Sequence, residues 1–487
     1  MSTTTLSGIA PENVWRFFEE ISQIPRCSQN EDQIRAYLTN FAKTRDLQHL
    51  QDTIGNIIIK KPATPGNEHA RGVILQGHMD MVCEKNSQIE HDFSKDPIKL
   101  VKDGSWLKAD GTTLGADNGI ALAMALAVLD SDSLEHGPLE ALFTTDEESG
   151  LTGALELDPS LLDGRILVNM DSEEEGFFII GCAGGVTTSG WCPVEWSPTP
   201  AGYVHYKLSV TGLKGGHSGG DIHENRGNAI KFAVRILWNL LEKVDVRIAG
   251  LDGGGKHNAI PRECFVTFVA PANQQDKTLQ IIDDIRNNIA AEYQDIEAGL
   301  QISLEHEQTA PEKVLSPKAT FKAVNCVFMM PHGVDEMSRT IPGMVETSTN
   351  LASVNLQDYE VQIITSQRSS SASKRDNMAN RITAILRCPG ARVSYSSLYP
   401  AWTPDPDNPL IDVFKSIYRK LNNSDPEFTA IHAGLECGVI GDKFPDMTMI
   451  SFGPDLQEVH TPNEQLSIPS VERIWDMLIE ALRGLAE

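Results

Sequence analysis

Hydrophobic residues recur at helical spacing in two segments near the start of the chain. Residues 12–21 carry Val14, Phe17 and Phe18, and residues 31–43 repeat the pattern. Apolar side chains three and four positions apart line one face of a helix and leave the opposite face polar. The pattern therefore predicts two amphipathic helices in the N-terminal region.

Short continuous apolar runs follow at residues 73–75, 139–145 and 166–170, and another lies at residues 447–452. Strands buried on both faces of a sheet read as continuous apolar runs, as in parallel sheets. Residues 120–129, between the first two runs, are rich in Ala and Leu, which favour helix. Strands alternating with helices predict an α/β fold, with a mainly parallel sheet and helices on both faces.

The pattern changes after the glycine-rich residues 181–185. Residues 203–211 alternate between apolar and polar positions, residues 228–241 have helical spacing, and residues 264–270 and 359–365 again resemble strands. Alternation is typical of an antiparallel sheet with one face toward solvent. We therefore expect a second, smaller α+β domain in the middle of the chain.

The composition limits the classes of function. A chain of 487 residues is too long for one ordinary hydrophobic core, so two or more domains are expected. The formal net charge of -26 disfavours nucleic acids and anionic membranes as partners, because both attract basic surfaces. The eight cysteines form no Cys-x-x-Cys pair and no dense framework, residues 1–10 have no basic and apolar leader, and no apolar run is long enough for a membrane span. These features indicate a soluble protein of the reducing cytoplasm.

Three of the expected buried strands end in possible metal ligands, which are His78, the adjacent Glu147 and Glu148, and Asp171. The carboxyl ends of parallel strands meet at one edge of a sheet, where ligands gather. An acidic run after one strand is usually a solvated loop. Carboxylates gathered at one edge repel each other unless a cation compensates them, so the recurrence favours a divalent metal ion.

Asp117 stands at the start of the Ala- and Leu-rich helix and has two possible roles. An aspartate at this position commonly caps the helix by accepting backbone N–H bonds. Taken alone, the cap is the favoured role; the flanking Gly115 and Gly119 allow close approach and make Asp117 a candidate ligand that bridges two ions as well. In such a site Glu147 and Glu148 cannot easily do the same work; one would bind metal while the other acts as a general base.

A competing motif lies at residues 216–220, Gly-His-Ser-Gly-Gly, which fits the Gly-x-Ser-x-Gly pattern of serine hydrolases. That motif requires an abrupt turn from a strand into a helix, whereas residues 221–226 separate these glycines from the next expected helix. The alternatives are a plain glycine-rich loop and a flexible loop that delivers His217 to a substrate carbonyl. Ser218 as a nucleophile is the least favoured of the three.

Taken together, the motifs resemble those of the co-catalytic zinc peptidases that include carnosinases, aminoacylases and carboxypeptidase G. The resemblance runs from about residue 10 to the C-terminus and is strongest to the members that cleave Xaa-His dipeptides. The motifs that carry it are His78-x-Asp80, Thr112–Gly119, Asp146–Gly150, Asp171–Gly176, Gly181–Gly185, Gly212–Gly220, Asn258–Arg262, Ile431–Gly438 and His460-Thr-Pro.

The resemblance implies a ligand set for two divalent ions, most commonly Zn²⁺, with Co²⁺ or Mn²⁺ as substitutes. His78 and Asp171 would hold one ion, Glu148 and His460 the other, and Asp117 would bridge them. The composition alone does not distinguish His460 from other histidines of the chain. That assignment comes from the resemblance.

The resemblance also implies the catalytic and substrate-binding residues. Asp80 would orient His78, and Glu147 would activate the water between the ions. His217 would stabilise the tetrahedral oxyanion, Arg368 would bind the substrate carboxylate through its planar guanidinium, and Asn258 would add a hydrogen bond.

The resemblance divides the chain into a catalytic domain of residues 1–184 and 401–487 and an inserted lid and dimerisation domain of residues 185–400. The expected protein is a cytoplasmic homodimer whose substrate is a dipeptide such as carnosine. Two alternatives stay open within this chemistry: an N-acyl amino acid amidohydrolase and an aminopeptidase of broader specificity. A scaffold that binds metal without catalysis is a weaker alternative, because Glu147 and His217 are both present.

Overall fold

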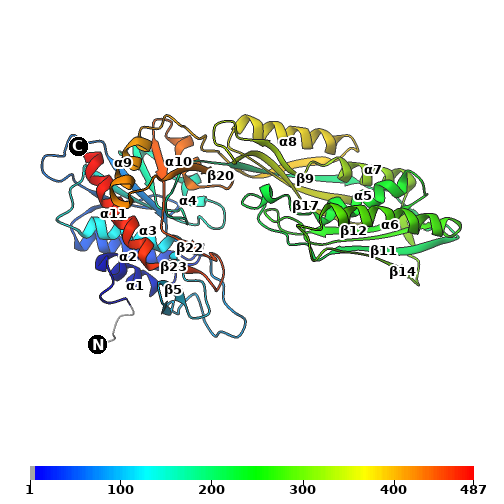
Figure 1. Ribbon diagram of the computed structural model, residues 1–487, viewed down its shortest axis with the longest axis horizontal. Helices are drawn as coiled ribbons and strands as arrows, with labels where there is room; N and C mark the ends of the chain where they lie inside the picture. The colour runs from blue at the N-terminus through cyan, green and yellow to red at the C-terminus, as the bar shows by residue number, and fades with distance from the viewer. Residues whose placement is uncertain (1–5, 487) are drawn as a thin grey trace. The chain divides into compact units, whose positions relative to one another are not determined.

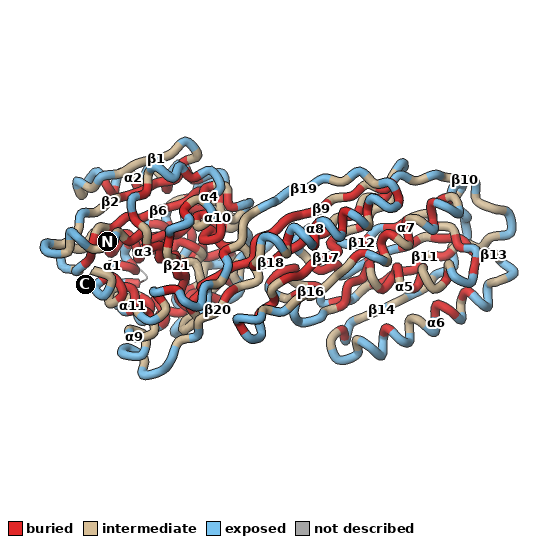
Figure 2. Tube along the Cα trace, turned by 90° about the horizontal axis from the view of Figure 1, so that it is seen from above, coloured by how far each residue is buried: buried red, intermediate tan, exposed pale blue. Residues whose placement is uncertain are grey.

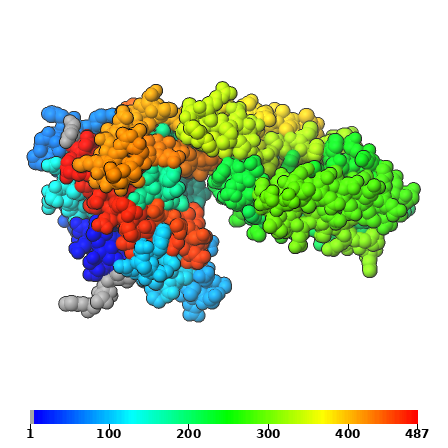
Figure 3. Space-filling view, viewed as in Figure 1, coloured from blue at the N-terminus to red at the C-terminus, as the bar shows by residue number. Residues whose placement is uncertain are grey.

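The computed structural model describes residues 6–486, and its chain divides into two compact units. The expectation for residues 1–10 therefore lies partly outside the described residues. Unit 1 holds the described residues up to Cys182, together with Trp402–Ala430 and the residues from Leu435 onward; unit 2 holds Ala183–Ala401 and Ile431–Gly434. Segments from both ends of the sequence thus share unit 1, which carries blue, cyan, orange and red atoms in Figure 3, whereas unit 2 is green to yellow.

An eight-stranded sheet with the order β1-β2-β6-β3-β7-β21-β8-β20 forms the centre of unit 1. Its four inner strands, β6, β3, β7 and β21, are parallel, and antiparallel strands extend the sheet on both sides. The inner strands are almost fully buried, as the red segments of β6 and β21 show in Figure 2. The strands are β1 (Gln48–Gln51), β2 (Ile57–Lys61), β3 (Val73–His78), β6 (Leu139–Thr144), β7 (Ile166–Asn169), β8 (Phe177–Cys182), β20 (Glu427–Ile431) and β21 (Thr448–Ser451).

Helices pack on this sheet because its strands are apolar on both faces. One hydrophobic core joins the sheet to α1, α2, α3, α9 and α11 through residues such as Phe18, Leu38 and Leu126. In α3, thirteen of its residues are buried, which explains why its sequence has no polar face. The helices are α1 (Glu12–Ser22), α2 (Asp32–Thr44), α3 (Ala116–Asp130), α4 (Thr152–Glu156), α9 (Leu410–Asn422), α10 (Glu436–Lys443) and α11 (Ile468–Ala486).

A small antiparallel sheet of unit 1 with the order β22-β23-β5-β4 connects the C-terminal region to an earlier hairpin. Its strands are β4 (Leu100–Asp103), β5 (Trp106–Ala109), β22 (Leu456–Gln457) and β23 (Gln465–Ser467). Because β22 and β23 pair directly, the chain between them forms a loop, and this loop carries His460. The pairing of β23 with β5 fixes that loop to the N-terminal part of unit 1.

Unit 2 is built on a nine-stranded antiparallel sheet with the order β14-β11-β13-β12-β17-β18-β9-β19, to which β16 adds by pairing with β17. Alternate residues of β13, such as Val266 and Phe268, are buried while Phe265 is partly exposed, so one face of the sheet packs on a core. The strands are β9 (Gly184–Pro193), β11 (Tyr203–Thr211), β12 (Arg247–Gly254), β13 (Cys264–Pro271), β14 (Gln301–Glu307), β16 (Gly333–Met337), β17 (Val345–Leu356), β18 (Glu360–Ser369) and β19 (Arg392–Tyr399).

Four helices contribute to the hydrophobic core of unit 2 and lie along the sheet in Figure 1. They are α5 (Ala229–Leu241), α6 (Gln275–Glu292), α7 (Pro317–Met329) and α8 (Ala372–Arg387), and a separate strand pair consists of β10 (Trp196–Pro198) and β15 (Lys313–Leu315). Within residues 6–486, no helix has the length and apolar character needed to cross a lipid bilayer.

The mixed α/β class expected from the sequence is confirmed. Cys27 and Cys83 form a disulfide, a pairing that the sequence analysis did not predict. The two residues are 56 positions apart, and the backbone pairing of Cys27 with Met81 brings their segments together. Such a pairing depends on the tertiary fold, so the spacing of the cysteines in the sequence does not predict it.

Candidate metal centre

The predicted ligands at the strand ends gather at one edge of the unit 1 sheet. His78 is the last residue of β3, Glu147 and Glu148 follow β6, and Asp171 follows β7. The three strands are parallel and in register, with His78 opposite Thr144 and Gln76 opposite Asn169. Their carboxyl ends therefore coincide, which is where parallel sheets collect ligands.

Asp117 lies between two histidines that come from distant parts of the sequence. Its Oδ1 is 3.0 Å from His78 Nε2, and its Oδ2 is 3.1 Å from His460 Nε2. His78 Nε2 is also 3.3 Å from Asp171 Oδ1, and His460 Nε2 is 3.0 Å from Glu148 Oε2. The two oxygens of one carboxylate thus face two separate sets of potential ligands.

These contacts form two groups of possible metal ligands that share Asp117. One group is His78, Asp117 and Asp171; the other is Asp117, Glu148 and His460; in each group the ligand atoms lie within 4.8 Å of one another. Imidazole nitrogens and carboxylate oxygens without a cysteine suit zinc in a catalytic site, or manganese or cobalt. Glu148 Oε1 is buried and has no hydrogen-bond partner among residues 6–486, which is consistent with an oxygen that binds a cation.

The charges of the centre show that it needs positive charge. Burial opposes protonation of His78, but the adjacent Asp171 and Asp117 carboxylates raise its pKa well above the usual value. Hydrogen bonds to Asp117 and Glu148 raise the pKa of His460 to about 11. Burial, opposed by His78, raises the pKa of Asp171 to about 6. Protons on the imidazoles would compensate the carboxylates, and a divalent cation would supply positive charge in the same place.

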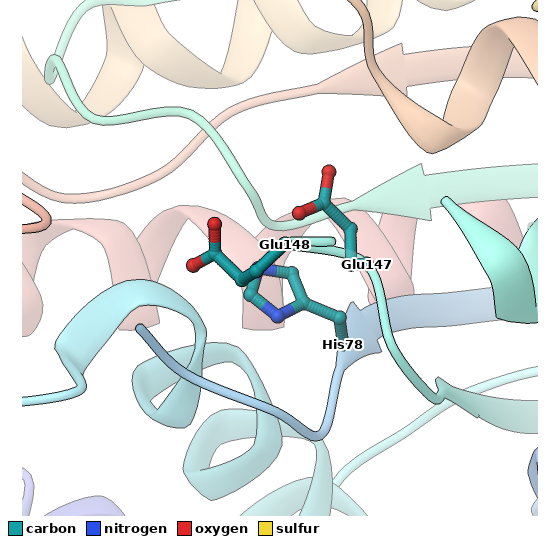
Figure 4. A group of neighbouring side chains, drawn as sticks. All are labelled: His78, Glu147 and Glu148. Carbon is teal, nitrogen blue, oxygen red and sulfur yellow. The ribbon is translucent and has the colours of Figure 1, made fainter. Parts of the chain in front are cut away.

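Glu147 belongs to a third group, with His78 and Glu148, whose side chains are drawn in Figure 4. The carboxylates of Glu147 and Glu148 diverge above the His78 ring, so the two adjacent glutamates point to different places. Burial, opposed by His78 and assisted by Asp171, raises the pKa of Glu147 well above its usual value. A carboxylate with a raised pKa is suited to accept a proton at neutral pH.

Asp80 is fully buried and holds the surrounding loops as well as His78. Its Oδ1 is 3.4 Å from His78 Nδ1 and accepts a hydrogen bond from the backbone N–H of Glu147 at 3.0 Å. Its Oδ2 accepts from the backbone N–H of Glu148 at 3.2 Å and from the Ser28 hydroxyl at 2.7 Å. Burial would raise its pKa, but the contacts with His78 outweigh this effect and lower the pKa to about 2. One carboxylate therefore fixes both the imidazole and the loop that carries the two glutamates.

The helix-cap interpretation of Asp117 is wrong. Asp117 makes no side-chain capping hydrogen bond, and its backbone is not helical. The buried Glu464 carboxylate satisfies the helix N-terminus instead, because it accepts hydrogen bonds from the backbone N–H groups of four residues at 2.7 to 3.3 Å, namely Leu114, Gly115, Ala116 and Asp117. Sequence reasoning missed Glu464, since nothing in its surroundings reveals a partner about 350 positions away.

Buried polar residues form a hydrogen-bond network next to the strand ends. Glu436, at the start of α10, accepts hydrogen bonds from Gln76 at 2.5 Å and from Thr144 at 2.6 Å, and Gln76 accepts one from Asn169 at 2.6 Å. Gln76 and Asn169 stand two positions before His78 and Asp171, so they share the same face of the sheet. Burial raises the pKa of Glu436 to about 7. These residues, too, were missed from the sequence.

Unit 2 contains a second group of predicted residues. Arg368, on β18, is almost buried; its Nη2 is 3.4 Å from His217 Nε2 and its Nη1 donates to the Tyr399 hydroxyl at 2.7 Å. Ser348, opposite Arg368 in the sheet, contacts His432 Nε2 at 2.7 Å. Burial and the Arg368 charge lower the pKa of His432 to about 3, so its ring is neutral. Sequence reasoning did not assign a role to Tyr399 or His432.

The remaining predicted residues of unit 2 differ in their surroundings. Asn258 is exposed, and its backbone oxygen accepts a hydrogen bond from the Ser218 backbone N–H at 2.8 Å. The Ser218 hydroxyl is buried and has no hydrogen-bond partner within the part of the chain that is described. A serine nucleophile needs a base within hydrogen-bond reach, so this arrangement does not support a serine hydrolase. Arg375 is ion-paired with Asp376, which leaves Arg368 as the more available of the two arginines.

The family to which the chain belongs follows from comparison with known proteins. The sequence model of peptidase family M20/M25/M40 matches residues 74–484, which is most of the chain. The chain belongs to this family, and it is a peptide-bond hydrolase.

Two relatives are similar over nearly the whole chain. The cytosol non-specific dipeptidase of Escherichia coli (strain K12) is 40% identical over 481 residues, which is 99% of either chain. The crystal structure of an aminoacylhistidine dipeptidase from Vibrio alginolyticus is 39% identical, covers 98% of both chains and superposes with a TM-score of 0.90. A tripeptidase from Staphylococcus aureus, 17% identical with a TM-score of 0.58 over 98% of this chain and 99% of its own, shares the fold.

Proposed function

We propose that this protein is a dipeptidase that binds two divalent metal ions and hydrolyses Xaa-His dipeptides such as carnosine. The observation that carries the proposal is the pair of ligand groups sharing Asp117, whose two oxygens face different histidines. The names of the two similar relatives, a non-specific dipeptidase and an aminoacylhistidine dipeptidase, support the substrate class.

In this proposal His78 and Asp171 would hold one ion, Glu148 and His460 would hold the other, and Asp117 would contribute to both. The donor set fits zinc, with cobalt or manganese as substitutes. The buried, unpartnered Glu148 Oε1 and the repulsion among the carboxylates both favour a bound cation. His460 is about half exposed, at 48%, which leaves this side of the centre open to solvent and substrate.

The ions, when bound, would supply Lewis acidity, which would polarise the scissile carbonyl and lower the pKa of the attacking water so that it loses a proton more easily. Glu147 takes the proton from the attacking water and gives it to the leaving amine, as its raised pKa allows. Asp80 keeps the loop of Glu147 in place through the backbone N–H bond at 3.0 Å and orients the imidazole of His78.

Unit 2 is proposed to recognise the substrate. Arg368 binds the carboxylate through its planar guanidinium, His217 stabilises the tetrahedral oxyanion, and Asn258 adds a hydrogen bond. The near burial of Arg368 supports this role, because a buried guanidinium whose Nε has no partner among the described residues retains a free donor for an anion. We also propose that His432 lies near the bound carboxylate with an uncharged ring, so that it does not compete with Arg368 for that carboxylate.

We further propose that residues 1–184 and 401–487 form the catalytic domain, and that residues 185–400 form an inserted lid through which two subunits dimerise. A cytoplasmic location is supported by the name of the E. coli relative, which is a cytosol dipeptidase.

A second candidate is a peptidase of the same mechanism with broader specificity, which the name of the non-specific relative favours. An amidohydrolase acting on N-acyl amino acids would use the same chemistry but would not need a free amino group on its substrate. The three candidates differ in the substrates that they turn over.

The test is hydrolysis of carnosine, of Xaa-His and non-histidine dipeptides, and of N-acyl amino acids before and after chelation. Zinc, manganese and cobalt are then added back separately. We expect chelation to abolish dipeptide hydrolysis and the ions to restore it. Equal turnover of other dipeptides would replace the Xaa-His assignment by broad specificity, and activity that survives chelation would overturn the metal mechanism.

A further inference from the structure

The disulfide between Cys27 and Cys83 lies beside the metal centre. Its Cα atoms are 5.7 Å apart, within the usual range for a disulfide, and both residues are half-buried, so reagents in solution can reach the bridge. Cys83 follows His78 by five positions. The other six cysteines are free thiols, of which only Cys388 is exposed.

The bridge fixes the segment of residues 26–28 to the chain that leaves β3. Cys27 pairs with Met81 in the backbone, and the Met81 N–H donates to the Arg26 carbonyl at 3.1 Å. The Arg26 guanidinium donates in return to the carbonyls of Met79 at 3.0 Å and Asp80 at 2.8 Å. The disulfide and these hydrogen bonds together join residues 26 and 27 to residues 79–83, which follow His78 directly.

The same segment contacts the turn that leads to Asp117, and it reaches the loop of Glu147 and Glu148 through Asp80. The Ser28 hydroxyl donates to Asp80 Oδ2 at 2.7 Å, and Asp80 holds the backbone of Glu147 and Glu148. Arg26 also donates to the carbonyl of Gly115, two positions before Asp117. A cross-link at position 27 thus restrains the neighbours of Asp80 and Gly115, which position the proposed ligands, and does not involve a ligand directly.

We propose that Cys27–Cys83 is a site of reversible thiol–disulfide exchange that takes a small thiol as co-reactant, and that its redox state sets how firmly the loops of the metal centre are held. The proposal draws on the proposed cytoplasmic location, because disulfides there are usually transient and serve catalysis or redox sensing. The bridge is half-buried and lies beside hydrogen bonds that hold Asp80 and the Gly115 turn, and this position fits such a site.

The exchange balances as two steps. A thiolate attacks one sulfur of the bridge, forming a mixed disulfide and releasing the other cysteine as a thiolate, which takes up a proton. A second thiol attacks the mixed disulfide, so the protein leaves with two thiols and the co-reactant leaves as its own disulfide. The protein gains two electrons, which two small thiols lose.

The test uses the full-length protein, purified without reductant and equilibrated in glutathione buffers from fully oxidised to fully reduced. Trapping with a small alkylating reagent and peptide mass spectrometry measure the fraction of Cys27 joined to Cys83. The thiols are then removed by gel filtration without oxygen, because they bind zinc themselves. Two further readouts follow on the same samples: the rate at which metal passes to a chelator, and the melting temperature of the metal-free protein.

We expect the bridge to form and open within this series. Opening should speed metal loss by about 3- to 10-fold, which is less than the roughly 10- to 100-fold effect of removing an outer contact of a metal ligand, because the bridge acts on those contacts only indirectly. It should also lower the melting temperature of the metal-free protein by about 5 °C, because the bridge constrains the unfolded chain. None of these readouts needs a substrate, so they stand apart from the test of dipeptidase activity.

Variants separate the bridge from the other thiols. Cys27→Ser with Cys83→Ser should behave like the reduced protein in every buffer, and Cys388→Ser should keep the full response. If the double variant does not fold, the reduced and alkylated wild-type protein takes its place. A Cys27–Cys83 bridge that never forms in the series overturns the proposal, as does a bridge that opens without a change in metal loss.

Discussion

Asp117 owes its position to residues that are not themselves proposed metal ligands. The Glu464 carboxylate accepts four backbone N–H groups from the turn that ends in Asp117, and Arg26 holds the carbonyl of Gly115 from the other side. Gly115 has a φ of +69°, and a Cβ there would lie 2.6 Å from the Arg26 guanidinium, so only glycine fits between the two groups. The backbone of the turn is thus fixed before any metal binds.

Removing the Glu464 carboxylate should weaken metal binding. In Glu464→Ala four buried N–H groups lose their acceptor, so Asp117 loses its fixed position, and we expect the affinity for the metal to fall about 10- to 100-fold. Competition with a chromophoric chelator measures this affinity. Glu464→Gln, which keeps one carbonyl oxygen, should lie between Glu464→Ala and wild type. Unchanged affinity in Glu464→Ala would show that Glu464 supports the fold alone.

Glu147 provides the complementary prediction, on the chemistry of the centre. Glu147→Ala removes the proposed general base but none of the proposed ligands, so turnover should fall by about 100- to 10,000-fold while metal content stays at the wild-type level. Steady-state kinetics and metal analysis of the same sample measure the two effects. Glu156→Ala, an exposed glutamate on α4, is the matched control and should keep wild-type activity. Near-normal activity in Glu147→Ala would contradict the mechanism.

At the scale of elements, the apolar runs were sufficient to predict the central strands. Continuous burial at residues 73–75 and 166–170 predicts inner strands, and parallel inner strands end at one edge, so the proximity of His78, Glu148 and Asp171 was accessible from the sequence. His460 was not, because its loop reaches the edge through the pairing of β22 and β23. That assignment relied on resemblance to a family.

The parts of the site that no pattern predicted share a physical cause. Glu464, Arg26 and Ser28 act through hydrogen bonds to distant backbone and side-chain atoms, as does Glu436 through Gln76 and Thr144. The local sequence indicates secondary-structure propensity and burial. These contacts depend instead on the tertiary arrangement of the loops, which local sequence does not encode. The Cys27–Cys83 bridge escaped prediction for the same reason.

The start of α5 allows a prediction about pH. Asn228 caps α5 by accepting from the backbone N–H groups of Ile230 and Lys231, and its Nδ2 lies 3.3 Å from His332 Nδ1. Burial and the charge of Lys231 lower the pKa of His332 to about 4. The neutral ring therefore stabilises the fold above pH about 6.5, the usual pKa of histidine, and this contribution is lost as the pH falls toward about 4.

Between pH 7 and pH 5 the opening free energy of the α5 amides should fall by about 1 to 2 kcal/mol, as measured by hydrogen exchange. His332→Gln should flatten this dependence, since the amide does not titrate. The exposed His306, on β14, is the control, and His306→Gln should leave the slope as in wild type. A slope that persists in His332→Gln would assign the effect to other groups.

At the scale of the whole molecule, the order of segments constrains how the chain works. Asp171 and His460 belong to unit 1, although residues 183–401, which belong to unit 2, separate them in the sequence. A centre that needs both residues therefore requires the two sequence segments of unit 1 to fold together. The proposed residues for substrate recognition, His217 and Arg368, lie in unit 2, whereas the proposed metal ligands lie in unit 1.

This division allows a test of whether two subunits share a site. If His217 acts on the centre of a partner subunit, Glu147→Ala and His217→Ala proteins should each be inactive but should restore each other when mixed. In a mixed dimer, the subunit with intact Glu147 receives His217 from its partner. With random exchange of subunits, about a quarter of the wild-type activity should return.

Native mass spectrometry of the mixture confirms that the subunits have exchanged, and carnosine hydrolysis measures the recovery. A mixture of Glu147→Ala with Asp171→Ala is the control: one site of that mixed dimer lacks the base and the other lacks a proposed metal ligand, so no activity should return. Exchange without recovery in the first mixture would place His217 in the site of its own subunit. A protein that remains monomeric throughout would contradict the proposed dimer, because no partner would then be present to supply the histidine.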